Sequence, residues 1–149
     1  MQMVKRSLWL GIGLLALTGT AAHAASLAPV QTSVCQLIKA PLNSAVTVSL
    51  SATAARDPRH GVAFLDAHCR GQRVEFRFAD HLRPTSKAGR FEAAITPRSP
   101  DLSLRLFRVE GVSGTFDPNA GEHGMLVVDH VDHFEKLSGW PAEFASPSP

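Results

Sequence analysis

The apolar residues of several short segments recur at every second position, and this alternation constrains the fold more than any other feature. Residues 46–51 read Val-Thr-Val-Ser-Leu-Ser, and residues 73–78 read Arg-Val-Glu-Phe-Arg-Phe. Successive side chains of a β-strand point to opposite faces of a sheet, so each pattern predicts a strand with one face against a core. Turn residues precede a third short apolar segment, Val62–Asp66. We therefore expect three successive strands joined by short loops.

The middle of the chain predicts an irregular connection followed by a curved strand. Prolines and a glycine interrupt residues 79–100, so we expect a connection there with a helical turn or two over Arg90–Ile95. Alternating leucines then predict a strand over Leu102–Phe116, in which the apolar phase shifts at a bulge. Gly111 and Gly114 suit a sharply curved strand, as a small closed barrel requires.

A loop over Asp117–Gly121 precedes a last predicted strand, Met125–His133, whose consecutive apolar residues predict burial on both faces. Over residues 134–144 we expect Trp140 to pack as an anchor. A five-stranded antiparallel barrel of the OB type has this order of elements, with a short helix between its third and fourth strands. We therefore predict a mainly β, small OB-like antiparallel barrel with a short N-terminal helix. A small β-sandwich is the alternative.

The N-terminal residues have the composition of an export signal. Residues 5–24 contain Lys-Arg, the apolar run Leu8–Leu17 and a final Ala-His-Ala, which is typical of a cleaved secretory signal. We predict a signal peptide over 1–24, an OB-like domain over 25–144 and a disordered tail over 145–149. The apolar run is about half of the roughly 20 residues of a spanning helix, so no stable membrane anchor is expected. The predicted localisation is periplasmic or secreted.

The two cysteines predict a covalent link between a helix and a strand region. Ser33-Val34-Cys35-Gln36 has the form of a capping box, which predicts a short helix that carries Cys35 and ends before Pro41. Cys69 is the only other cysteine, and an even pair in an exported chain most simply forms a disulfide. A redox-active thiol or a metal thiolate would need a C-x-x-C spacing, which the sequence does not contain.

Charge argues against nucleic acid as a partner. Without the predicted signal the chain has 13 basic and 13 acidic residues, and a net charge of zero provides no general attraction to phosphates. Arg73, Glu75 and Arg77 occupy the outward positions where stacking aromatics for single strands are expected, and the chain has no tyrosine. Basic residues concentrate in 56–108 and acidic residues in 109–149, so we expect charge neutralisation across paired strands.

The apolar residues that keep the phase of their strands predict one core. Its predicted members are Val46, Val48, Leu50, Phe64, Val74, Phe76, Phe78, Leu104 and Val127. We expect these side chains to meet inside the barrel because alternation places them on one face of each strand.

Short motifs in both halves carry a resemblance to known proteins. The first half contains Val34-Cys35-Gln36-Leu37, an alternating strand, and then His60-Gly61, Leu65-Asp66 and Cys69; the second half contains Val109-Glu110-Gly111 and Leu126-Val127-Val128. This arrangement resembles a group of uncharacterised exported bacterial proteins with the pattern C…H-G-x-x-L-x-D-x-x-C, and the layout resembles periplasmic bacterial OB-fold proteins. Those proteins usually carry an aromatic residue and Gly-Lys before the first strand, where this chain has Asn43-Ser44-Ala45. The resemblance implies an exported OB-like fold and supplies no catalytic residues.

The sequence provides few residues for catalysis or metal binding. The densest group of potential metal ligands is Asp129-His130-Val131-Asp132-His133. On one strand His130 and His133 would point to opposite faces, so we assign no metal site and expect no cofactor. There is no G-x-S-x-G motif and no conspicuous carboxylate pair, so we expect no enzymatic activity.

The predicted ligand-binding residues lie in two loops. In an OB barrel the loops that join strands one to two and four to five flank the usual ligand face. We expect Arg59 and His60 in the first loop to meet Glu122 and His123 in the second at one end of the barrel. The predicted function is an exported, non-catalytic binding or envelope-maintenance protein, whose partner is an envelope protein, a glycan or a small charged ligand. The alternative is a histidine-dependent, metal-binding periplasmic protein.

Overall fold

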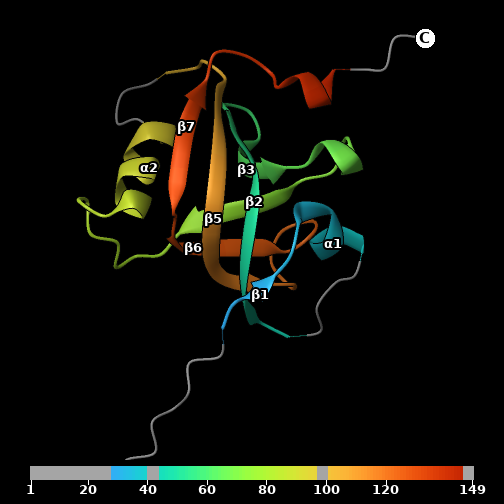
Figure 1. Ribbon diagram of the computed structural model, residues 1–149, viewed down its shortest axis with the longest axis vertical. Coiled ribbons are helices and arrows are strands. Elements are labelled where there is room, and N and C mark those ends of the chain that lie inside the picture. Colours follow the sequence, from blue (N-terminus) through green and yellow to red (C-terminus); the bar gives the residue numbers. More distant parts are fainter. Residues whose placement is uncertain (1–27, 40–43, 97–100, 146–149) are drawn as a thin grey trace, which may run out of the picture.

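The computed structural model describes residues 28–39, 44–96 and 101–145 (Figure 1). The predicted signal peptide and the tail beyond residue 145 lie outside these ranges. The elements follow in the order β1 (Val30–Gln31), α1 (Val34–Lys39), β2 (Val46–Asp57), β3 (Gly61–Leu65), η1 (Ala67–Cys69), β4 (Val74–Phe78), α2 (Lys87–Ile95), β5 (Arg105–Asp117), β6 (Met125–His130), β7 (His133–Leu137) and η2 (Ala142–Phe144).

Five strands close into a barrel in the order β2-β3-β4-β6-β5, with β5 pairing back to β2. In the chain α2 lies between the third and fourth barrel strands, as the OB-like prediction requires. The sandwich alternative is wrong because the β2–β5 pairing closes the sheet. The prediction of a wholly antiparallel barrel is also wrong, because β4 and β6 run parallel. An odd number of strands cannot alternate direction around a closed ring, so at least one neighbouring pair must be parallel.

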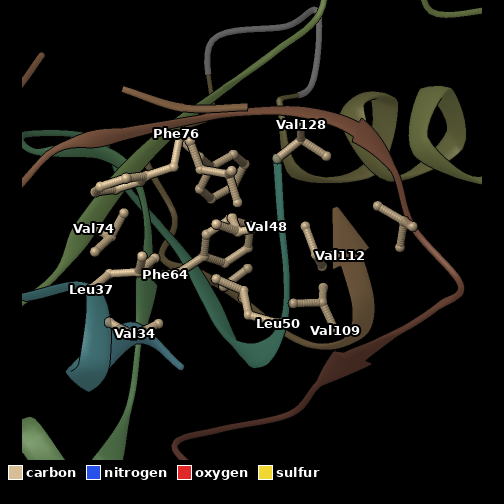
Figure 2. Close-up of a cluster of buried hydrophobic side chains, with 14 of the residues drawn as sticks. Val34, Leu37, Val48, Leu50, Phe64, Val74, Phe76, Val109, Val112 and Val128 are labelled. Atoms are coloured by element: carbon tan, nitrogen blue, oxygen red, sulfur yellow. The ribbon is translucent and has the colours of Figure 1, made fainter. Parts of the chain in front are cut away.

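Most of the predicted core lies inside this barrel. Figure 2 shows Val48 and Leu50 of β2 beside Phe64 of β3. The predicted residues that are at most 3 % exposed are Val48, Leu50, Phe64, Val74 and Phe76, while Val46 and Phe78 are partly buried and pack against them. The alternation of residues 46–51 and 73–78 therefore identified the inward faces of β2 and β4.

Two predicted core residues lie elsewhere. Leu104 is 46 % exposed, because β5 begins after it at Arg105 and not at Leu102. On β6 the buried residues are Leu126 and Val128, whereas Val127 is only partly buried. The predicted burial of both β6 faces is therefore wrong: this strand alternates like the others, and its outer face remains partly accessible.

The N-terminal helix and the disulfide agree with the sequence predictions. The Gln36 backbone N–H donates to Ser33 Oγ at 3.2 Å, and the Ser33 N–H donates to Gln36 Oε1 at 3.0 Å, which confirms the capping box. Cys35 on α1 forms a disulfide with Cys69 of η1, with the two Cα atoms 5.5 Å apart. The bond therefore joins α1 to the connection between β3 and β4.

Helix α2 is longer than the predicted helical turn. Ser86 caps its start, because the Ser86 Oγ accepts the Gly89 N–H at 3.0 Å. Phe91 is fully buried on its inner face, with its ring centroid 5.3–6.2 Å from those of Phe76, Phe78, Phe107 and Phe134. The cap and this aromatic contact hold a helix where the prolines and Gly89 predicted a mainly irregular connection.

Strand β5 bends as its glycines predict. Gly111 has a φ of +57°, and the register with β6 shifts at a bulge next to Gly114. A Cβ atom at Gly114 would collide with the carbonyl oxygen of Val127 on β6, so the two backbones approach closely there. The predicted single strand Met125–His133 is wrong, because the Asp132 N–H donates to carbonyls at the β5 bend and the chain turns before β7.

Candidate functional site

The β2–β3 turn holds the first pair of predicted binding residues. Asp57 Oδ1 accepts the Arg59 backbone N–H at 2.8 Å, and Asp57 Oδ2 lies 3.1 Å from His60 Nδ1. The Arg59 N–H first, and then the His60 side chain, lowers the pKa of the Asp57 carboxyl. Asp57 therefore stays ionised and orders its own turn, and His60 lines a hollow beside it.

The second pair of predicted binding residues lies at the other end of the barrel. His123 Nε2 is 3.8 Å from Glu122 Oε1, and both residues line a hollow of about 200 Å³ next to α1. Strand β2 runs antiparallel along β5, so Arg56 at its end pairs with Arg105, whereas Val46 at its start pairs with Phe116. The loop after β5 therefore follows the end that is remote from the β2–β3 turn. The expectation that the four residues form one rim is wrong, while binding by either pair stays a prediction.

The outer face of β2 and β3 is apolar where outward residues of a barrel are usually polar. Ala55 of β2 pairs with Ala63 of β3 and, on its other side, with Leu106 of β5. These three residues are at most 8 % exposed, although their neighbours Ala54, Phe64 and Phe107 are the ones that face the main core. Because the alanine side chains are small, they leave a depression on this surface, here called the apolar floor. The larger side chains of Leu104 and Trp140 border it.

Three adjoining hollows share Leu65 as a lining residue, and the smallest of them lies over Ala55 and Ala63. Their volumes are about 320, 340 and 180 Å³. Trp140 lines both the 340 Å³ and the 180 Å³ hollow. Phe144 lines both the 320 Å³ and the 340 Å³ hollow. We refer to the three hollows around Leu65 together as the outer groove.

The C-terminal segment forms one wall of the outer groove. In Figure 1 the chain leaves β7 at the top of the barrel and reaches η2 beyond it. The Trp140 ring is tilted against the Phe144 ring, with centroids 5.6 Å apart, and Trp140 is 52 % exposed. The predicted anchor is therefore a half-exposed aromatic wall, and Leu104 lies with it in the smallest hollow.

Polar and charged side chains line each of the three hollows. His60 and Arg73 line the smallest hollow, and Asp66 and Arg70 line the 340 Å³ hollow. Burial raises the pKa of the Asp66 carboxyl, but hydrogen bonds from the His68 backbone and ring outweigh this effect, so that the pKa is lowered. The groove thus combines an apolar floor with ionised carboxylates and arginines.

Sequence reasoning identified His60 in this groove but missed Leu65 and Trp140 as site residues. A signal was present, because Ala63 and Leu65 are apolar on the opposite phase to the core residue Phe64. Such a segment has two apolar faces, of which the barrel interior covers one. The C-terminal segment lies beside the second face, where Trp140 lines two hollows together with Leu65.

The histidine-rich stretch has no concentrated set of ligand atoms. His130 Nε2 lies 2.9 Å from Asp132 Oδ1 on exposed side chains, while His133 begins the next strand. Within the described residues, the one close group of three ligand-type side chains is Cys35, Asp66 and Cys69. Its two sulfur atoms are joined in the disulfide.

The expected neutralisation across paired strands is not observed in the part of the chain that the structure describes. Every ion pair there joins residues at most four positions apart, such as Arg105 with Asp101 and Arg77 with Asp80. Arg108 pairs in register with Glu135 of β7 without forming an ion pair. The charges therefore order local turns more than they hold strands together.

Comparisons with protein-family models, curated proteins and solved structures each found no match to this chain. The fold of residues 28–39, 44–96 and 101–145 alone defines the class of protein, which is a mainly β, closed five-stranded mixed barrel with the short helices α1 and α2. Among the described residues, no helix is both long and apolar enough to cross a membrane.

Proposed function

We propose that this protein is an exported, non-catalytic binding module of the cell envelope that holds its partner in the outer groove. The observation that carries the proposal is the apolar outer face of β2 and β3, where Leu65 lines all three hollows and Trp140 lines two of them. Trp140 shows that an aromatic side chain fits this surface, and an aromatic ring supplies much contact area at a small cost in conformational entropy. The candidate partners are an envelope protein, a glycan or a small charged ligand.

The charges around the groove support binding more than catalysis. A general acid or base works best with a pKa near the operating pH. The pKa values of the Asp57 and Asp66 carboxyls are instead lowered, because each accepts hydrogen bonds within its own turn. These carboxylates order the loops beside the groove and give its border fixed charge.

Two observations support export to the periplasm or the exterior. The Cys35–Cys69 disulfide is consistent with an oxidising compartment. The N-terminal pattern of Lys-Arg, an apolar run and Ala-His-Ala is typical of a cleaved secretory signal and points to the same compartment.

The test is capture of a partner from an envelope extract by the immobilised protein. We expect the wild type to retain a specific partner and a Leu65→Gln variant to lose it. The substitution would place a polar side chain in the lining of all three hollows. The matched control is Val30→Gln, which changes an exposed apolar residue on β1 and should leave capture unchanged. Melting temperatures of both variants show whether each is folded.

Equal capture by folded Leu65→Gln and wild type would contradict the proposal, as would capture of nothing by the wild type. An Arg59→Ala/His60→Ala variant tests the predicted loop residues beside the groove in the same assay, and we expect it to lose capture at a nearly unchanged melting temperature. Zinc or copper binding that His130→Ala abolishes would instead favour the metal-binding alternative.

A further inference from the structure

We propose that the C-terminal segment Ser138–Ala145, here called the strap, occupies the outer groove as an intramolecular ligand. The external partner is then a segment of another protein with the same chemistry: a peptide with two aromatic side chains four positions apart. This inference rests on the proposed function and deepens it, because it selects a protein segment from the three candidate partner classes.

The aromatic side chains of the strap are placed where a bound peptide would put its own. Trp140 and Phe144 lie four positions apart, and their ring centroids are 5.6 Å apart. Each ring stands between two of the hollows, and every hollow also contains Leu65. Removing the two rings would enlarge the hollows that they line, each of which borders Leu65.

Arg70 holds the backbone of the strap and not its side chains. Its guanidinium donates hydrogen bonds to the carbonyl oxygens of Glu143, at 3.4 Å, and Ala145, at 2.9 Å. Every peptide presents such carbonyls, so these contacts would serve a segment of another protein equally well. Recognition of main-chain carbonyls next to an apolar floor favours a peptide over a glycan.

The strap is attached weakly enough to be displaced. Its described hydrogen bonds from backbone to backbone are internal, from the Phe144 N–H to the Pro141 carbonyl and from the Ala145 N–H to the Ala142 carbonyl, and it pairs with no strand of the barrel. Trp140 leaves half of its surface in water, so its burial contributes only part of the hydrophobic stabilisation of a covered ring. A tethered segment still competes at an effective concentration on the order of millimolar, which a free partner must overcome.

The experiment measures binding of a labelled copy of the strap to the purified, disulfide-bonded full chain. The probe is the fluorescein-labelled peptide Ser-Gly-Trp-Pro-Ala-Glu-Phe-Ala, followed by fluorescence anisotropy. A Trp140→Ala/Phe144→Ala variant empties the groove, and we expect it to bind the peptide at least about tenfold more tightly than the wild type because its own strap no longer competes. A peptide with alanine in place of both aromatic residues should not bind.

Two further variants keep the test decisive. Adding Arg70→Gln to the emptied variant removes the guanidinium donors to the carbonyls of a bound peptide, so it should weaken peptide binding to the emptied groove. Adding Leu65→Gln to the emptied variant should abolish binding, whereas adding Val30→Gln should not. Equal peptide affinity in the wild type and the folded emptied variant would overturn the proposal, as would equal binding of the aromatic and alanine peptides or no binding at millimolar peptide.

Failure of this inference is distinguishable from failure of the proposed function. Capture from an envelope extract that depends on Leu65, but is not competed by the peptide, would keep the binding module and reject a peptide partner in favour of a glycan or a small ligand. Peptide binding without any Leu65-dependent capture would keep the strap as an intramolecular ligand and reject an external partner.

Discussion

Phe76 lies at the centre of an aromatic group that connects the barrel wall to α2. Its ring stacks on Phe64 at a centroid distance of 4.0 Å and also contacts Phe78 and Phe91. Phe76→Ala should lower the free energy of unfolding by about 3–5 kcal/mol, because it removes a buried ring and leaves a cavity. Urea denaturation measures this loss. The partly buried Val127→Ala is the control and should cost clearly less, while a loss under about 1 kcal/mol for Phe76→Ala would mean that this face is not enclosed.

At the scale of elements, Asp101 connects α2 to the barrel strands. Asp101 Oδ2 accepts hydrogen bonds from Arg105 at 2.6 and 3.1 Å, and Arg105 also donates to the Ala94 carbonyl of α2 at 2.6 Å. The Arg56 guanidinium of β2 donates to the Asp101 carbonyl at 2.8 Å. One short segment therefore fixes the end of α2 against the start of β5 and the end of β2.

This connection makes stability depend on acid pH. The Arg105 side chain holds the pKa of the Asp101 carboxyl well below its ordinary value of 3.8. A lowered pKa means that the contribution to stability is complete above about pH 4 and is lost as the pH falls towards the lowered value. Asp101→Asn should therefore destabilise the protein at pH 7 and progressively less below pH 4, as urea midpoints will show. Asp80→Asn, at a 99 % exposed carboxylate, is the control; a constant difference between Asp101→Asn and wild type would refute the assignment.

For the whole molecule, the disulfide joins two elements that are 34 positions apart in the chain. Replacing Cys35 and Cys69 together with serine should lower the free energy of unfolding by about 3–4 kcal/mol, because the unfolded chain regains the freedom of a closed loop. Thiol titration of the unfolded, unreduced wild type should find no free thiol. Two free thiols, or a serine variant as stable as the wild type, would contradict the predicted role.

Local patterns were sufficient for the first half of β2, for β4, for the capping box of α1 and for the disulfide pair. Each depends on residues close together in the chain, or on a count of two cysteines, so the sequence carries the information directly. The parallel β4–β6 pair was also within reach, because a closed ring of five strands requires one. The start of β5 at Arg105 could not be predicted, because the exposed Leu104 continues the alternation of the strand that follows it.

By itself the sequence determined a mainly β domain with one cysteine pair and the inward faces of β2 and β4, because periodicity acts over a few neighbouring residues. Only the tertiary structure decided where the loops and the groove lie. The register of β2 on β5 places His60 and His123 at opposite ends of the barrel. Closure of the sheet, together with the path of the chain after β7, brings Leu65 and Trp140 to one groove although they are far apart in the sequence. No local pattern reports such a contact, because it depends on how the whole chain folds back on itself.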